Sequence, residues 1–318
     1  MRQSTVKSPE PLFSDGDVVA MIGDSITCDG RWWVKVREQW LARHPGAFCD
    51  FRNCGIPGGG AEGALRRYAW DIAPLRPTVA LVMFGLNDVW REGYRPPVTE
   101  EMLTGRADCL QRFLSNMNEL VERLVQDGAR ICLLTPTPFD QYASDRPVPN
   151  LPGVDDALAV CAGMVRGIAV VRRLTVVDLH TPLRRRCAAS ELLISEDRVH
   201  PSDLGHTAMA ELVSAALLPG VSVVVSPELQ AASQALHAAE SRQRIIAMFR
   251  CWAEGTVGGN DDDAVRRILE RNGEEDRNPW VLEQKEMCRR LLPRQAELAA
   301  EVAALRQRLA EIGHLNLG

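Results

Sequence analysis

Short apolar runs and longer amphipathic stretches alternate along residues 17–220. Runs that are apolar at successive positions are typical of strands covered on both faces, as in a parallel sheet. Strands are therefore predicted at 18–22, 47–53, 78–84, 129–134 and 174–179.

The stretches between these runs carry apolar residues at helical spacing, as in residues 107–126, where they form one stripe. Helices are expected at 31–43, 61–70, 107–126, 154–173 and 203–218. Because strands alternate with helices, we predict an α/β fold, a flavodoxin-like α/β/α sandwich with a five-stranded parallel sheet. This domain spans residues 17–220 and follows a flexible lead-in at residues 1–16.

After residue 220 the pattern is helical throughout, so residues 221–318 are predicted to form a helical C-terminal extension. Helices are expected at 228–253, 262–271 and 279–312. A heptad seam, with residues at alternating spacings of four and three, runs through the last one: Leu291, Gln295, Leu298, Val302, Leu305, Leu309 and Ile312. Two arrangements bury such a seam equally well, a hairpin packed against the α/β domain of the same chain or a coiled coil that forms a homodimer.

The bulk composition excludes several classes of protein. With 46% hydrophobic and 25% charged residues, the 318-residue chain resembles an ordinary globular protein. Its formal net charge of -5 argues against a nucleic-acid partner, because nucleic-acid-binding surfaces are normally basic. The first ten residues lack the apolar core of a signal peptide, and no apolar run reaches the length of a membrane span. We therefore expect a cytoplasmic protein with no membrane span.

The residues that commonly bind metals or cofactors do not follow the spacing of a known metal or cofactor motif. The nine cysteines are scattered without a Cys-x-x-Cys pair, which favours neither a disulfide framework nor a zinc site. No cluster of histidines, cysteines and carboxylates has the spacing of metal ligands. The glycine run at 58–60 lacks the Gly-Lys-Ser/Thr ending of a phosphate-binding loop. We therefore expect neither a metal nor a cofactor.

Four polar strings stand where the predicted sheet binds ligands. Three of them follow predicted strands and one precedes the last helix of the sheet domain: Gly23-Asp-Ser25, Asn53-Cys-Gly-Ile-Pro-Gly-Gly-Gly-Ala61, Gly85-Leu-Asn-Asp88 and Asp197-Arg-Val-His-Pro201. In open α/β sheets these positions lie at one edge, so the strings are expected to converge. Taken alone, Ser25 could cap a helix and the glycines could form a turn, but convergence favours chemistry.

The chemistry that these residue types support is acyl transfer. A serine hydroxyl becomes a nucleophile when a histidine accepts its proton and a carboxylate orients that histidine. Asp197 and His200 are three residues apart, so one short loop can present both to Ser25. The oxyanion of the tetrahedral intermediate needs donors, and the Ser25 N–H, a backbone N–H of the glycine run and the Asn87 amide can supply three.

In this order the four strings resemble the conserved blocks of the SGNH hydrolases, also called the GDSL esterase and lipase superfamily, over residues 18–217. The resemblance implies Ser25 as the nucleophile, Asp197 and His200 as the rest of the triad, and Gly58 and Asn87 as oxyanion donors. Asp24 and Asp88 are interpreted as carboxylates that hold the site by hydrogen bonds.

The sequence departs from the common family pattern in two places. Ile26 stands where a leucine is usual, which is a tolerated apolar exchange. After Gly58 the family often has a polar pair, whereas this chain continues Gly59-Gly60-Ala61. The choice of Gly58 over Gly59 as the oxyanion donor therefore stays open.

Residues that follow these strings in the sequence are candidates for binding the substrate. Trp90, Arg91 and Tyr94 follow Asn87 and can form a wall of the pocket, where the rings stack on a sugar and Arg91 meets a carboxylate or phosphate. Phe139 is a second candidate wall, and all four can equally pack a loop.

We therefore predict a serine esterase whose partner is a small-molecule ester, with short-acyl esters of carbohydrates as the first choice. Esters of lipids and thioesters are the enzymatic alternative. A third alternative is a binding or scaffolding module that lacks catalysis and is built on a hydrolase fold.

Overall fold

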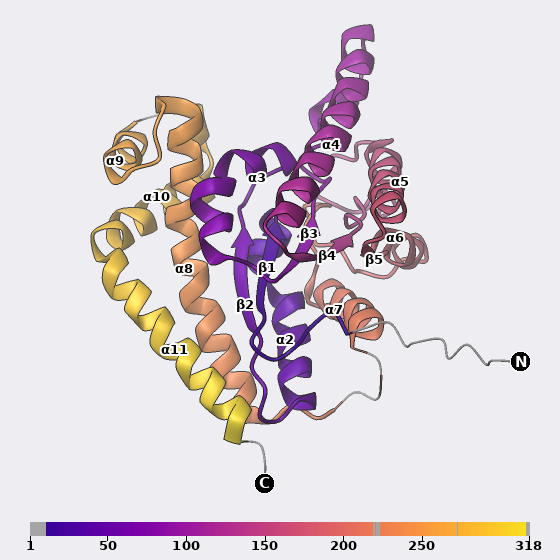
Figure 1. Ribbon diagram of the computed structural model, residues 1–318. Helices are drawn as coiled ribbons and strands as arrows, with labels where there is room; N and C mark the ends of the chain where they lie inside the picture. The colour runs from indigo at the N-terminus through magenta and orange to yellow at the C-terminus, as the bar shows by residue number, and fades with distance from the viewer. Residues whose placement is uncertain (1–10, 219, 221–222, 272, 316–318) are drawn as a thin grey trace, which may run out of the picture.

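A five-stranded parallel sheet forms the centre of the molecule in the computed structural model, which describes residues 11–218, 220, 223–271 and 273–315 (Figure 1). The strand order is β2-β1-β3-β4-β5, and all neighbours are parallel. The strands are β1 (Val18–Gly23), β2 (Asp50–Gly55), β3 (Val79–Met83), β4 (Arg130–Leu134) and β5 (Thr175–Val177). The predicted flavodoxin-like sandwich is confirmed.

Helices cover both faces of the sheet (Figure 1). One face carries α2 and α7, which contact each other, and the opposite face carries α3, α4 and α5. The helices of this part are α1 (Ser25–Asp29), α2 (Arg31–Arg43), α3 (Ala61–Arg67), α4 (Glu100–Gln126), α5 (Val154–Arg172), α6 (His180–Ala188) and α7 (Asp203–Leu217). Because both faces are covered, residues 19–22 and 79–83 are almost completely buried.

Several boundaries differ from the predicted ones for local reasons. Helix α4 begins at Glu100 rather than at residue 107, because Thr99 caps it by accepting a hydrogen bond from the Met102 N–H at 3.2 Å. Strand β2 begins at Asp50, where its pairing with β1 starts, rather than at residue 47. Helix α6 was not predicted, because its polar sequence carries few apolar residues and shows no clear stripe.

Residues 1–10 of the predicted lead-in, which spans residues 1–16, lie outside the described residues. From residue 11 onward the chain is placed, and the Phe13 ring packs in the core, 5.3 Å from the ring of Phe51. The domain boundaries at residues 16 and 220 stay a prediction.

The C-terminal part consists of α8 (Pro227–Val257), α9 (Asp262–Glu270), α10 (Pro279–Leu291) and α11 (Gln295–Leu315). The predicted single helix over 279–312 is wrong, because a 3-10 turn at Leu292–Arg294 separates α10 from α11. Pro293 lies in this turn, and proline cannot donate the backbone hydrogen bond that a continuous α-helix needs.

Among the helices of the described residues, none combines the length and apolarity that a membrane crossing needs.

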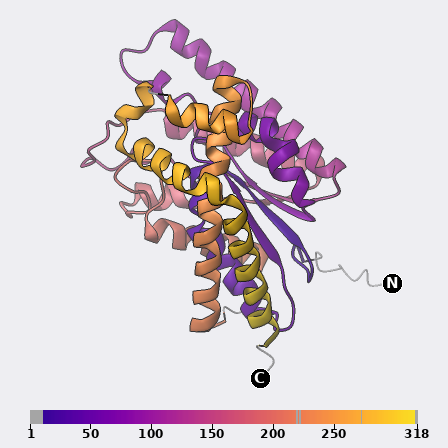
Figure 2. The same cartoon turned by 90° about the vertical axis from the view of Figure 1, so that its left-hand side faces the viewer.

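Four of the seven residues of the heptad seam are buried within one chain. Its residues Leu298, Val302, Leu309 and Ile312 are at most 6% exposed, and α11 runs alongside α8 (Figure 2). Val302, Leu309 and Ile312 belong to the same apolar core as the sheet. The hairpin alternative therefore accounts for the seam, and the homodimeric coiled coil is not supported.

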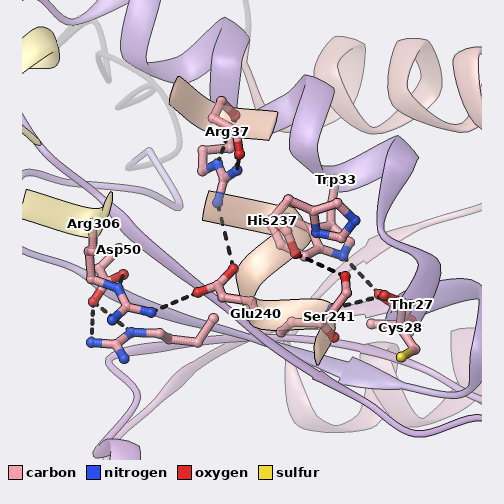
Figure 3. Close-up of polar contacts among 12 residues, drawn as sticks. Thr27, Cys28, Trp33, Arg37, Asp50, His237, Glu240, Ser241 and Arg306 are labelled. Atoms are coloured by element: carbon pink, nitrogen blue, oxygen red, sulfur yellow. Dashed lines mark hydrogen bonds and ion pairs between the residues drawn. The ribbon is translucent and has the colours of Figure 1, made fainter. Parts of the chain in front are cut away.

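Buried ion pairs anchor α8 to the sheet domain. Figure 3 shows Glu240 of α8 between two arginines, with Arg306 of α11 at 2.7 Å and Arg37 of α2 at 3.9 Å. Arg306 also pairs with Asp50 of the edge strand β2 at 2.8 Å, and Arg37 donates to the backbone oxygen of Ser233 at 2.6 Å. Because breaking a buried ion pair costs about 3–5 kcal/mol, these contacts fix α8 along the sheet edge.

We expect Leu309→Ala to lower the free energy of unfolding by about 2–5 kcal/mol, because it empties a fully buried site between α11 and the core. Gln307→Ala, on the exposed face of the same helix, should change it by no more than about 0.5 kcal/mol. Chemical denaturation at several protein concentrations measures both. Equal stability of the two variants, or a midpoint that falls on dilution, would contradict packing within one chain.

Candidate active site

Ser25 is held at the corner where β1 passes into α1. Asp24 caps α1, because its side chain accepts a hydrogen bond from the Ile26 N–H at 2.9 Å. The cap is therefore Asp24 and not Ser25, which leaves the Ser25 hydroxyl available for other contacts. The corner requires glycine at position 23, since a Cβ there would lie 2.1 Å from the Thr27 hydroxyl and 2.8 Å from the Met83 carbonyl oxygen.

A chain of hydrogen bonds links Ser25, His200 and Asp197. The Ser25 Oγ lies 2.8 Å from His200 Nε2, and His200 Nδ1 lies 2.5 Å from Asp197 Oδ2. The other carboxylate oxygen of Asp197 accepts hydrogen bonds from the Ser195 hydroxyl and from the backbone N–H groups of Val199 and His200, at 2.8 to 2.9 Å. The loop before α7 therefore holds the carboxylate rigidly, and the carboxylate orients the imidazole ring toward the serine.

The hydrogen bond between His200 and Asp197 favours the protonated form of the His200 imidazole. The hydrogen bond to Asp197 raises the pKa of His200 above its ordinary value of 6.5, although burial acts in the opposite direction. Burial by itself would raise the pKa of Asp197, but the hydrogen bonds from His200, Val199 and Ser195 together outweigh it and hold the pKa well below the usual range. The pair is therefore arranged to accept a proton on His200 while Asp197 stays ionised.

The two residues predicted to donate to an oxyanion, Gly58 and Asn87, line the same cavity as Ser25. Gly58 has a left-handed backbone, with φ of 73°, and within the described residues its N–H donates to no backbone acceptor. The Gly59 N–H is already used, because it donates to the Ile56 carbonyl at 2.9 Å. The turn therefore favours Gly58 over Gly59 as the donor.

The Asn87 amide lies next to this turn and donates to the Gly59 carbonyl oxygen at 3.1 Å. Because the amide has two N–H groups, the second one is left for a ligand.

Asp88 joins the two turns that carry these donors. Its carboxylate accepts from the Ala61 N–H at 2.8 Å and from the Gly85 N–H at 3.0 Å. A Cβ at Gly60 would lie 2.8 Å from this carboxylate, so only glycine allows the close approach. Burial raises the pKa of both Asp88 and Asp24 to about 6. Both predicted supporting carboxylates thus bond backbone N–H groups close to the site.

The Ser25–His200 pair opens into a cavity of about 840 Å³ that also reaches Gly58, Asn87 and Asp197. Sequence reasoning missed one wall of this cavity, which comes from α8, from α10 and from the residue before α10: Ser241, Arg244, Ile245, Met248, Asn278, Trp280 and Gln284. No local pattern singles these residues out, because they reach the site only through the packing of the C-terminal helices. Ser241 and Cys28, which line the cavity from α8 and α1, are labelled in Figure 3.

Arg244 ties this wall to the sheet domain. Its guanidinium pairs with both oxygens of Asp71, at 2.6 and 2.8 Å, and donates to the Gly55 carbonyl at the end of β2 at 3.1 Å. Bidentate pairs of this kind fix geometry as well as charge. The wall of the cavity is therefore held at a defined distance from the carboxyl ends of the strands.

The four predicted wall residues lie in different places. Arg91 lines the catalytic cavity, and Trp90, Arg91 and Phe139 line an adjoining cavity of about 400 Å³. Tyr94 lines neither of these two cavities, because its ring is buried under the Arg106 guanidinium, 4.0 Å from the ring centroid. Within the described residues, no group of three or more histidine, cysteine or acidic side chains is placed to hold a metal ion.

Comparison with solved structures shows a similar fold. A gut microbial diltiazem-metabolizing enzyme is 16% identical, with 95% of this chain and 96% of that chain covered and a TM-score of 0.80. An acetylxylan esterase, Axe2 from Geobacillus stearothermophilus, is 22% identical, with 66% and 97% covered and a TM-score of 0.52. The first similarity extends over the C-terminal helices, whereas the second covers two thirds of the chain.

At the level of sequence, no curated protein matches the chain. The model of the GDSL-like Lipase/Acylhydrolase family, however, matches residues 21–208, which is more than half of it and contains Ser25, Asn87 and His200. The protein therefore belongs to the GDSL-like Lipase/Acylhydrolase family and is a serine ester hydrolase.

Proposed function

We propose that the protein hydrolyses short-acyl carboxylic esters of polar alcohols such as carbohydrates, through a covalent acyl-enzyme on Ser25. The observation that carries this proposal is the continuous hydrogen-bond chain from Ser25 through His200 to Asp197, three residues that line one cavity. A nucleophile, a base and an orienting carboxylate within hydrogen-bond distance are the parts that acyl transfer requires.

In the first step the Ser25 oxygen attacks the ester carbonyl carbon while His200 accepts its proton. The carbonyl oxygen becomes an oxyanion, which accepts hydrogen bonds from the N–H groups of Ser25 and Gly58 and from the Asn87 amide. His200 then gives the proton to the leaving alcohol as the carbon–oxygen bond breaks. In the second step water attacks the acyl-enzyme by the same route, releasing the acid and restoring Ser25.

The polar alcohol is supported by the wall that the C-terminal helices supply. Ser241, Asn278 and Gln284 bring hydroxyl and amide groups to the cavity, and these suit an alcohol with several hydroxyls. Trp280 is 43% exposed and lines the same cavity, so its ring can stack on a sugar face. In this proposal Trp280 takes the role that the sequence suggested for Trp90 and Tyr94.

Two alternatives give different outcomes in one experiment. Ile245 and Met248 add apolar surface to the cavity, and a lipid esterase or thioesterase would use it for a longer acyl chain. A binding module without catalysis would leave activated esters untouched. The intact set of Ser25, His200, Asp197 and Asn87 argues against the second alternative.

We expect hydrolysis of p-nitrophenyl esters to be fastest with acetate and to fall as the acyl chain lengthens. Ser25→Ala should lower kcat to the background rate, a loss of about 10⁶-fold, because no nucleophile remains. Initial rates measured over the ester series test both statements. Ser115→Ala, on the exposed face of α4, is the matched control and should keep the wild-type rate.

A rate that rises with acyl length would instead favour a lipid esterase or thioesterase. Wild-type rates at background for every ester would support the binding module. Full activity in Ser25→Ala would show that another residue is the nucleophile.

The pH dependence should follow His200. Because only neutral His200 can accept the Ser25 proton, kcat/KM should fall as the pH drops through its pKa, which Asp197 holds above 6.5. Asp197→Asn should move this acid limb to lower pH and decrease kcat by about 10⁴-fold. Asp203→Asn, an exposed aspartate in the first turn of α7, is the control and should leave the profile in place. An acid limb that Asp197→Asn leaves unchanged would contradict this assignment.

A further inference from the structure

Arg91 lies where the catalytic cavity meets the adjoining one. The two cavities share Gly58, Asn87, Arg91, Asp197 and Val199, so Arg91 borders both of them beside the oxyanion donors. Its side chain is only partly exposed. A ligand whose ester group reaches Ser25 can therefore extend along Arg91 in either direction.

The Arg91 guanidinium has no hydrogen-bond or ion-pair partner among the residues that the structure describes. Three carboxylates act on it through their charges, and each is bonded elsewhere. Asp197 is used by His200, Asp24 accepts from the Ile26 N–H, and Glu92 pairs with Arg95 at 2.8 Å. Arg91 is therefore not needed to satisfy a neighbouring acid.

The turn that carries Arg91 does not depend on it either. The turn, η3 (Arg91–Tyr94), is held by Arg106, which donates to the Gly93 carbonyl at 2.8 Å and stacks on Tyr94. Arg95 closes its other end through Glu92. No contact in the described residues therefore gives the Arg91 charge a role in holding the turn.

The other arginine and the two aspartates that line the catalytic cavity each bond a partner. Arg244 is paired with Asp71, Asp29 is paired with Arg31, and Asp197 is paired with His200. Among the described residues, Arg91 therefore differs from these groups because its guanidinium donors meet no partner, although Asp197, which keeps its negative charge when His200 is neutral, acts on it through space. Burial lowers the pKa of Arg91, although the charges of Asp197, Asp24 and Glu92 act in the opposite direction. An anion bonded directly to the guanidinium would offset the cost of burying it.

We propose that Arg91 binds a carboxylate on the alcohol part of the substrate, so that the enzyme is selective for short-acyl esters of acidic alcohols such as uronic acids. This inference rests on the proposed function. A carboxylate matches the planar guanidinium fork with two parallel hydrogen bonds. It adds one negative charge to a site that already faces Asp197, Asp24 and Glu92, whereas a phosphate dianion would add two. The carboxylate belongs to the alcohol part because a short acyl group offers no atoms to carry it.

The test compares two acetylated sugars that differ in one group. The pair is a methyl glucuronoside and a methyl glucoside, each carrying one acetyl ester at the same position, and the readout is the ratio of their kcat/KM values. The wild-type ratio should favour the glucuronoside by about 10- to 100-fold, the range expected for a charge-assisted hydrogen bond. Arg91→Gln should bring the ratio close to one, mainly through KM, and Arg91→Lys should retain part of the preference.

Arg185→Gln is the matched control, because Arg185 is an exposed arginine of α6 that lines neither cavity. It should keep the wild-type ratio. A wild-type ratio near one, or an equal ratio in Arg91→Gln and wild type, would overturn the proposal. Thermal unfolding of each variant shows whether a changed ratio comes from a folded protein.

A binding measurement separates this inference from the proposed function. Ser25→Ala should bind unacetylated methyl glucuronoside more tightly than methyl glucoside in calorimetry, and adding Arg91→Gln should remove the difference. This result would support the carboxylate site even if the wild type hydrolysed neither ester, an outcome that would refute only the proposed function. Equal binding of the two sugars by Ser25→Ala would overturn the carboxylate site.

Discussion

The hydrogen bond between Ser25 Oγ and His200 Nε2 connects residues 175 positions apart, and much of the molecule is arranged to hold it. Ser25 follows β1, which lies between β2 and β3 in the sheet, whereas His200 stands in the loop before α7. Because all strands of the sheet are parallel, their carboxyl ends meet at one edge, and the connecting loops converge there. The glycine corner at position 23 and the carboxylate of Asp197 then fix the two side chains to within hydrogen-bond distance.

The C-terminal helices complete the site rather than accompany it. Glu240, between Arg37 and Arg306, holds α8 along the edge of the sheet, and Arg244 ties it to Asp71 near the cavity. These contacts bring Trp280 and its neighbours to the catalytic cavity as one of its walls. The similarity in fold to the diltiazem-metabolizing enzyme covers 95% of this chain, whereas the similarity to the acetylxylan esterase covers 66% of it.

The sheet and the candidate triad could be predicted because their signals are local. Apolar runs mark strands buried on both faces, and each polar string directly follows a strand or precedes a helix. The wall from α8 and α10 could not be predicted, because its residues meet the site through contacts between distant helices. Tyr94 illustrates the same limit: its position near Asn87 suggested a pocket wall, but packing against Arg106 buries it. The heptad seam predicted burial correctly and left its partner open, since α8 and a second chain offer the same apolar surface.

The proposed hydrolysis depends on Ser25 as the nucleophile and on His200 as the base that activates it. Reaction with a fluorophosphonate, followed by intact-mass measurement and peptide mapping, tests these two roles most directly, because this reagent is attacked by an activated serine and the adduct is stable. We expect one adduct per chain, on the peptide that contains Ser25, and no adduct in His200→Ala. An adduct on another residue, or labelling of Ser25 at the same rate in His200→Ala, would contradict these roles.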